Sequence, residues 1–385
     1  MRILITGICG FVGSTLARGL REGWPDWEIV GLDSLVRAGS ETNRRTLRDR
    51  GIKLYHGDVR NPSDLESLPP CDWIIEAAAN PGVLAGVDGK TSSRQLIEHN
   101  LVGTINMLEL LKQWRCGFTI LSTSRVYSIR ALAAIPVETQ GDRFVPRTNA
   151  PAPGPTAQPL AKPHDGSRIT HHALRIPHPV TPMPGFSPKG VAEDFSTEPP
   201  LSLYGSSKRA SELLACEYAE SFDLPMSILR CGVLAGAGQF GKIDQGIFSY
   251  WIHSYCRRRP LSYIGFNGTG CQVRDCLHAR DLLPLVAEQI KRPRLDAPRV
   301  LNVSGGLGQS ASLRQLSAWC AERFGPHTIA AERKNRPFDV PWLVLDSSQA
   351  GQVWNWKPQT PLAAIWTEIA DHAERNPGWL ALADD

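Results

Sequence analysis

The N-terminus of the chain carries a short apolar strand pattern followed by three evenly spaced glycines. Residues 2–6 fit a buried strand, and residues 14–20 show a helical pattern. Gly7, Gly10 and Gly13 stand between them. Glycines let the backbone turn tightly, and the helix behind them presents free N–H groups and the positive end of its dipole to a phosphate. The order strand, glycine turn and helix therefore predicts a variant, G-x-x-G-x-x-G, of the Rossmann motif that binds a dinucleotide pyrophosphate.

A second expected strand, at residues 28–32, ends at Asp33, which lies twenty residues after Gly13. Dinucleotide-binding folds place an acidic residue there, where it binds the ribose hydroxyls. A carboxylate at this place repels a 2′-phosphate, so Asp33 favours NAD over NADP. Two alternatives stay open, because Asp33 also fits a simple turn after a strand and because Arg37 is near enough to suit NADP.

Further strands and helices are expected to alternate along the next ninety residues. Strands are expected at residues 54–57, 73–77 and 118–121, and a helix at residues 96–114. This order predicts an α/β fold, a doubly wound parallel sheet covered on both faces by helices. Small residues after the strand at 73–77 would let a cofactor lie close to the backbone. The additional residues expected at the cofactor are Phe11, Val12, Asp58, Val59, Ala77, Ala78, Ala79 and Asn100.

Tyr204 and Lys208 lie four residues apart in a stretch with a helical pattern, so their side chains share one face. A phenol titrates at about pH 10, and a neighbouring ammonium lowers the pKa of the phenol by stabilising the phenolate. Such a pair is able to take a proton from a hydroxyl group as hydride leaves the carbon. Tyrosine and lysine also meet at this spacing on many solvated helices, so the pair gains weight only together with the glycine motif.

These motifs, with residues 122–127 and 272–275, resemble the extended short-chain dehydrogenase/reductase superfamily, specifically its nucleotide-sugar epimerases and dehydratases. The resemblance covers nearly the whole chain outside one insertion. It implies a Rossmann-type NAD-binding domain at residues 1–230. It also implies a smaller C-terminal α/β substrate-binding domain at residues 231–385, with some segments returning to the Rossmann domain. NAD is the cofactor and a nucleotide diphosphate sugar the substrate that the resemblance implies.

The resemblance also implies a role for individual side chains. Tyr204 would be the acid/base, Lys208 would orient the nicotinamide ribose, and Thr123 would hydrogen-bond the reacting oxygen, with Ser124 as the neighbouring alternative. Arg274 would bind the diphosphate, since a planar guanidinium suits phosphate oxygens, although an ion pair with Asp275 or Asp281 is the alternative. A further cofactor contact is implied for Arg230. The remaining substrate contacts implied are Arg125, Val233, Gln239, Gln245 and Arg336.

The chain departs from the dehydratases of this superfamily directly after the threonine. Dehydratases carry an Asp-Glu pair there, whereas this chain has Ser124 and Arg125. Elimination of water then lacks an obvious acid/base, so the sequence favours epimerisation by oxidation and re-reduction. The runs at residues 238–240 and 244–246 are most similar to those of the CDP-sugar 2-epimerases, which implies reaction at C2 of a CDP-sugar or another nucleotide sugar. The alternatives are a 4-epimerase, a dehydrogenase or reductase, and a non-catalytic NAD-binding sensor or scaffold.

Composition narrows the possible partners and the compartment. The net charge of +4 over 385 residues is spread along the chain, without a basic stripe that would indicate nucleic acid. The nine cysteines are scattered, as expected for reduced thiols in a cytoplasmic protein. We expect no membrane span, because uninterrupted apolar runs are too short. The resemblance further implies a homodimer that pairs through the helices at residues 96–114 and 203–221.

One segment differs in composition from the rest. From about Pro146 to Pro188, within an insertion at about residues 130–195, the chain is rich in proline, alanine and histidine. Such a segment reads as a loop or lid that covers the sugar pocket or makes a subunit contact. No acidic or cysteine partner stands at ligand spacing, so no metal is expected. The histidines concerned are His164, His171, His172 and His178.

Overall fold

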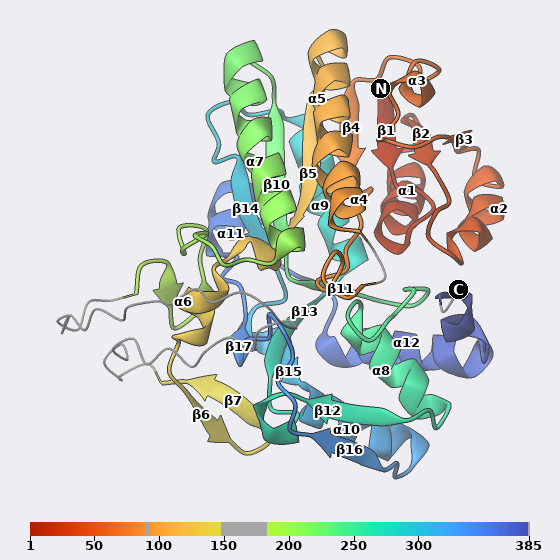
Figure 1. Ribbon diagram of the computed structural model, residues 1–385. Coiled ribbons are helices and arrows are strands. Elements are labelled where there is room, and N and C mark those ends of the chain that lie inside the picture. The colour runs from red at the N-terminus through yellow and green to blue at the C-terminus, as the bar shows by residue number, and fades with distance from the viewer. Residues whose placement is uncertain (90–91, 148–182, 384–385) are drawn as a thin grey trace.

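The computed structural model of the chain describes residues 1–89, 92–147 and 183–383, and its two halves meet along one edge of a central sheet (Figure 1). Seven parallel strands form this sheet, in the order β14-β10-β5-β4-β1-β2-β3. The order reverses between β1 and β4, which confirms the doubly wound sheet expected from the sequence. The strands are β1 (Arg2–Thr6), β2 (Glu28–Asp33), β3 (Lys53–His56), β4 (Trp73–Glu76), β5 (Gly117–Thr123), β10 (Met226–Cys231) and β14 (Val300–Val303).

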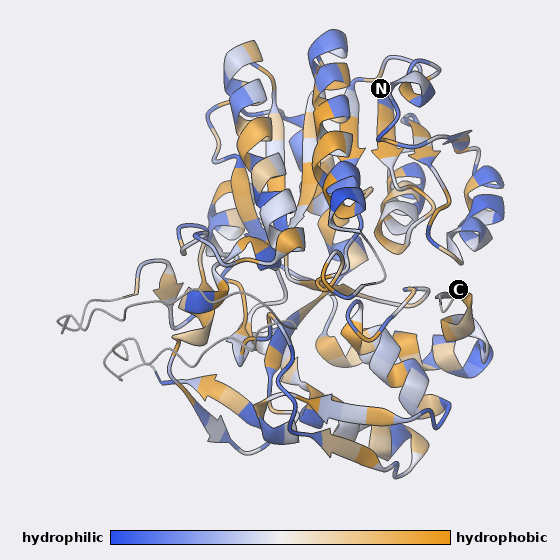
Figure 2. Ribbon diagram, viewed as in Figure 1, coloured by the Kyte–Doolittle hydropathy of each residue, from blue (hydrophilic) through white to orange (hydrophobic). Residues whose placement is uncertain are grey.

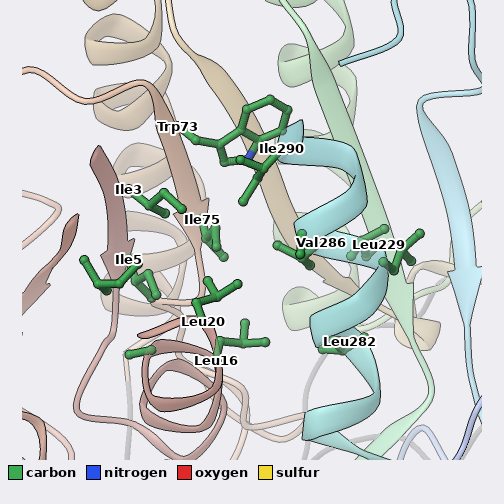
Figure 3. Close-up of a cluster of buried hydrophobic side chains, with 14 of the residues drawn as sticks. Ile3, Ile5, Leu16, Leu20, Trp73, Ile75, Leu229, Leu282, Val286 and Ile290 are labelled. Atoms are coloured by element: carbon green, nitrogen blue, oxygen red, sulfur yellow. The ribbon is translucent and has the colours of Figure 1, made fainter. Parts of the chain in front are cut away.

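Helices cover both faces of this sheet, and the strands are apolar on both (Figure 2). Ile3 and Ile5 of β1 pack against α1 and α9 on one face (Figure 3). Leu4 packs against α5 and α7 on the other. Strands buried on both faces have near-continuous apolar sequences. This is why residues 2–6 could be predicted as a strand from the sequence. The helices are α1 (Phe11–Gly23), α2 (Asn43–Arg48), α3 (Pro62–Leu65), α4 (Ser93–Ile97), α5 (Gly103–Trp114), α7 (Leu203–Phe222), α9 (Leu282–Lys291) and α11 (Ser348–Trp354).

The single helix expected at residues 96–114 is interrupted in the structure. A π-helical turn at Glu98–Val102 separates α4 from α5. Inside this turn the Asn100 side chain accepts a hydrogen bond from Asn80 N at 2.8 Å and donates to Asn80 O at 3.1 Å. The π-helical turn therefore directs the Asn100 side chain toward the loop after β4. Such turns are frequent at functional sites.

The second half of the molecule faces the carboxyl ends of the parallel strands (Figure 1). Phe248, Trp251, Leu316 and Ile369 belong to its own buried apolar core. A mixed sheet of β11, β13, β15 and β17 lies nearest the first half. The strands are β11 (Val233–Ala235), β12 (Leu261–Ile264), β13 (Val273–His278), β15 (Ser310–Ser312), β16 (Ile329–Glu332) and β17 (Trp342–Leu343). The helices are α8 (Ile247–Cys256), α10 (Leu313–Phe324) and α12 (Leu362–Arg375).

The chain crosses between the two halves more than once. It enters the second half after β10, and β14 and α11 return to the first sheet and its flank. The boundary expected near residue 230 stays a prediction. Among the described residues, no helix combines the length and the apolar character that crossing a lipid bilayer requires.

The flanks of the proline- and histidine-rich insertion form short regular elements. Val191 N donates to Val344 O at 2.9 Å, and Arg143 Nη2 donates to Ser310 Oγ at 2.7 Å, so both flanks are tied to the second half. Residues 148–182, with the four histidines named above, lie outside the described residues. The lid or contact role of the insertion stays a prediction. The elements are α6 (Ile129–Ala133), β6 (Val137–Gln140), β7 (Arg143–Pro146), β8 (Phe186–Ser187) and β9 (Gly190–Val191).

Candidate active site

The glycine turn joins β1 to α1 at the carboxyl edge of the sheet. Gly7 has a φ of +64°, and a Cβ there would lie 2.8 Å from the backbone of Ala78. A Cβ at Gly13 would lie 2.2 Å from Gly7 O. Gly10 is the N-cap of α1 and has no side chain to bond the first N–H groups. The turn is therefore compact and leaves the positive end of α1 open, as a pyrophosphate site requires.

The Asp33 carboxylate ends β2 next to this turn. It accepts hydrogen bonds from Cys9 N and Leu35 N, both at 2.8 Å. Burial raises the pKa of Asp33, and the two backbone hydrogen bonds act in the opposite direction. Arg37, which supported the NADP alternative, donates from Nη1 to Gln245 Oε1 at 2.7 Å and from Nη2 to Phe240 O. Arg37 is thus held by a loop of the second half, and the NADP alternative loses its support from this residue.

Substitution Asp33→Asn is expected to raise the affinity for NADP relative to NAD by about tenfold or more. The amide oxygen can still accept from one of the two backbone N–H groups, and the uncharged side chain no longer repels a 2′-phosphate. A cavity of about 160 Å³ beside Asp33 is also lined by Arg44 and Arg48, which would attract the added charge. Fluorescence titration with both cofactors measures the ratio. The exposed Asp49→Asn is the control, and an unchanged ratio in Asp33→Asn would contradict the assignment of Asp33.

The other residues expected at the cofactor line the same edge. Asp58 is paired with Arg60 at 2.6 Å and lines an open cleft of about 570 Å³. The Val59 side chain packs directly against Gly103, so closely that a Cβ on this glycine would clash with it. The backbone of Ala78 lies against Gly7, as described above. The backbone of the loop after β4 lies directly against the glycine turn, and the expected approach of the cofactor to Ala77–Ala79 stays a prediction. Phe11 lies against Gly236 of the second half, and Val12 packs into the core under α1. Ala77 and Ala79 flank Ala78 in the loop that follows β4.

Tyr204 lies in the first turn of α7, close to the carboxyl end of β5. Ser202 caps this helix by accepting a hydrogen bond from Gly205 N at 3.0 Å. A Cβ at Gly205 would lie 2.3 Å from Arg125 O, so glycine is needed for α7 to start against the end of β5. Burial raises the pKa of Tyr204, and a hydrogen bond with Thr123 acts in the opposite direction. Ser124 is buried beside Thr123, but the hydrogen bond to the phenol comes from Thr123.

Lys208 lies one turn after Tyr204, with only 2% of its side chain exposed. Its Nζ lies 4.0 Å from Oε2 of Glu76, the last residue of β4, which is also buried. Thr104 Oγ1 donates to Glu76 Oε2 at 3.1 Å. Sequence reasoning missed Glu76. The signal was present, since a carboxylate directly after three buried apolar residues needs a partner in the interior.

Three arginines lie close enough for their charges to interact, and one of them, Arg125, also interacts with Tyr204. Burial and the charges of Arg274 and Arg336 together lower the pKa of Arg125 to about 10, against the opposing effect of Asp339 and Tyr204. Arg274 Nη2 donates to Asp339 Oδ1 at 2.7 Å. Arg274 thus forms an ion pair, as the alternative expected, but with Asp339 and not with Asp275 or Asp281, which accept hydrogen bonds from other groups. This arginine cluster, Arg125, Arg274 and Arg336, is suited to an anion.

The loop at residues 239–246 connects the two halves around the site. Gln245 Oε1 accepts from Arg37 of the first half, and Ile243 O accepts from Arg336 Nη2 at 3.1 Å. Gln239 Nε2 donates to Leu234 O at 2.8 Å, whereas its Oε1 is buried without a hydrogen-bond partner. Val233 N donates to Asp275 Oδ1 at 3.1 Å, in the strand that leads into this loop. Because buried polar atoms are normally hydrogen-bonded, the unpaired Oε1 of Gln239 fits a site that binds a polar ligand.

Two residues expected at the cofactor are held by protein groups instead. Arg230 donates from Nε and Nη2 to Glu212 and from Nη1 to Tyr127 Oη and Glu193 O. With every nitrogen of its guanidinium committed, Arg230 stabilises the interior, and the expected cofactor contact is not supported. Asn100 is 1% exposed and donates to Ser207 Oγ at 3.1 Å, so it joins the loop after β4 to α7.

These residues fit NAD as a bound group. The glycine turn would hold the pyrophosphate, Asp33 the adenosine ribose, and Lys208 the nicotinamide ribose. The turn needs its glycines, because a Cβ at Gly7 would clash with the backbone of Ala78 and a Cβ at Gly13 with that of Gly7. Tyr204 and Thr123 would then face the reacting carbon of a substrate anchored by the arginine cluster.

Known proteins share both the sequence and the fold. The sequence profile described as "NAD dependent epimerase/dehydratase family" matches residues 3–150 and 180–304. CDP-paratose 2-epimerase of Salmonella typhi is 27% identical over 93% of this chain and 95% of its own length. UDP-glucuronate 4-epimerase of Thermodesulfobacterium geofontis is 23% identical over 92% of this chain and 91% of its own.

A solved structure supports the fold. UDP-glucuronic acid 4-epimerase of Bacillus cereus, in complex with UDP-glucuronic acid and NAD, superposes with a TM-score of 0.71 and 22% identity. The match covers 97% of this chain and 99% of that one. The profile match spans well over half of the residues and includes the glycine turn, Asp33, Thr123, Tyr204 and Lys208. The chain therefore belongs to the NAD-dependent epimerase/dehydratase family.

Proposed function

We propose that this protein is a nucleotide-sugar epimerase that oxidises one sugar carbon and reduces it again on the opposite face, at C2 of a CDP-sugar or a related nucleotide sugar. The observation that carries the proposal is the pairing of Tyr204 with Thr123 beside Lys208, without a carboxylate at positions 124 and 125. The likeness to a CDP-sugar 2-epimerase along 93% of the chain supports the choice of carbon and nucleotide.

In this mechanism, bound NAD supplies the acceptor and later the donor of hydride. Tyr204 as phenolate takes the proton of the substrate hydroxyl and returns it in the second half of the cycle. Thr123 holds the reacting oxygen by a hydrogen bond. Arg274 and the rest of the arginine cluster hold the diphosphate while the keto-sugar turns its other face to the cofactor. Binding energy remote from the reacting carbon thus keeps the intermediate in the site.

The test of the proposal is incubation with CDP-, UDP-, GDP- and dTDP-sugars in deuterated water, followed by NMR. We expect an epimer that keeps its original hydrogen at the inverted carbon, because hydride returns from the cofactor rather than from solvent. Release of a keto-sugar with an equal amount of NADH would replace the epimerase by the dehydrogenase alternative. Solvent deuterium at the inverted carbon would indicate proton abstraction instead of hydride transfer.

A homodimer that pairs through α4, α5 and α7 belongs to the same proposal. Leu213 on α7 is 52% exposed and Ile97 on α4 is 39% exposed, and these two helices contact each other. Leu213→Arg is expected to convert a dimer into a monomer, because a charge placed in an apolar interface core is left without a partner. Light scattering after gel filtration measures the mass. Leu307→Arg, at an exposed leucine in the second half, should leave the dimer intact.

A further inference from the structure

The mechanism proposed above leaves one buried charged residue of the site unused. Glu76 lies at the carboxyl end of β4 with 3% of its surface exposed. Its Oε2 lies 4.0 Å from Lys208 Nζ and accepts from Thr104 Oγ1 at 3.1 Å. It does not contact Tyr204 through any hydrogen bond among the described residues. The contact that links Glu76 to the phenol is therefore Lys208, which lies one helical turn after Tyr204.

We infer that Glu76 is a positioning residue that holds the Lys208 ammonium in place, one helical turn from Tyr204. The Lys208 side chain is 2% exposed, and burying a charge in the interior is costly unless a counterion lies close. A carboxylate at 4.0 Å offsets this cost and lets the lysine carry its charge in the interior. Lys208 needs that charge to stabilise the Tyr204 phenolate. Glu76 thus affects Tyr204, the acid/base of the site, through its effect on Lys208.

The charges around these groups leave Glu76 as the partner of Lys208. Burial raises the pKa of Glu76, and Lys208 and the hydrogen bond from Thr104 oppose this. On the side of Tyr204, Arg125 lowers the pKa of the phenol and the buried Cys231 thiol raises it. Burial also raises the pKa of Cys231 to about 12, so this thiol stays neutral at ordinary pH and does not replace Glu76 as a counterion.

The inference predicts that Glu76→Gln raises the pKa of Tyr204 by at least about one unit. The amide has the size of the carboxylate but no charge, so it no longer holds the Lys208 ammonium in place, and the phenolate loses the cation that stabilises it. The readout is the NMR titration of the Cζ-labelled tyrosines, with and without NAD. Only seven tyrosines are present, and the signal missing in Tyr204→Phe assigns Tyr204. This test needs no sugar, so it is independent of the proposed substrate, although the inference rests on the proposed hydride-transfer site.

Two further variants separate a charge effect from a structural one. Thr104→Val removes the hydrogen bond to Glu76 but keeps its charge, and we expect a much smaller change in the pKa of Tyr204. In a Lys208→Met background, Glu76→Gln should leave the pKa of Tyr204 unchanged or lower it, because the lysine that transmits the effect is absent. An unchanged or lowered pKa of Tyr204 in Glu76→Gln alone overturns the inference. So does an equal rise in both backgrounds.

Discussion

The variant Tyr204→Phe is expected to turn over a nucleotide sugar roughly 10²–10⁴ times more slowly than the wild-type protein. The phenyl ring keeps the packing of the first turn of α7, but no group remains to exchange a proton with the substrate hydroxyl. The lysine and the glycine turn are unchanged, so NAD binding should be close to that of the wild type. Steady-state rates and a cofactor titration on the same preparations measure both quantities.

Two further variants help to interpret the result for Tyr204→Phe. Tyr218→Phe, on the same helix, removes a hydroxyl that bonds only the surface residue Glu109 and should keep full activity. Thr123→Val removes the hydrogen bond that lowers the pKa of Tyr204. Because the phenolate is the active form, the rising limb of the pH–rate profile should move to higher pH. A Tyr204→Phe protein with wild-type rates would instead favour the non-catalytic NAD-binding alternative.

The parts of the site that were predictable from sequence are those in which one short segment carries the whole chemical signal. The glycine turn follows directly on β1, and Tyr204 and Lys208 share one turn of α7. Local spacing fixes such geometry, because strand and helix periodicities decide which way the side chains point. The interruption of the helix at residues 98–102 escaped prediction, since apolar periodicity continues through it.

The features that sequence reasoning missed join segments distant along the chain. Arg37 is 208 residues from Gln245, and Glu76 meets Lys208 only after β4 and α7 pack on the same sheet. The family resemblance implied that Arg230 contacts the cofactor. Its true partner, Glu212, lies on a helix that covers the sheet. Only the tertiary packing decides which charges meet in the interior.

Loss of Glu212 is expected to lower the free energy of unfolding by about 3–5 kcal/mol. This carboxylate is fully buried, pairs with Arg230 at 2.8 Å and accepts from Ser122 Oγ and Arg209 Nη1. In Glu212→Ala, Arg230 would stay in the interior without its counterion, which costs more than the lost contacts. Thermal unfolding followed by circular dichroism should show a midpoint several degrees lower. Glu217→Ala, at an exposed position of the same helix, should change the free energy by at most about 0.5 kcal/mol.

Removing both charges separates the structural role of Arg230 from a role at the cofactor. Arg230→Met in the Glu212→Ala background should recover most of the lost stability, because a buried ion pair is often replaceable by apolar side chains. If Arg230 serves only the interior, the recovered double variant binds NAD with wild-type affinity. A stable double variant with weakened NAD binding would return Arg230 to the cofactor site, as the family resemblance implied. The stability and the affinity of one protein thus decide between the two roles.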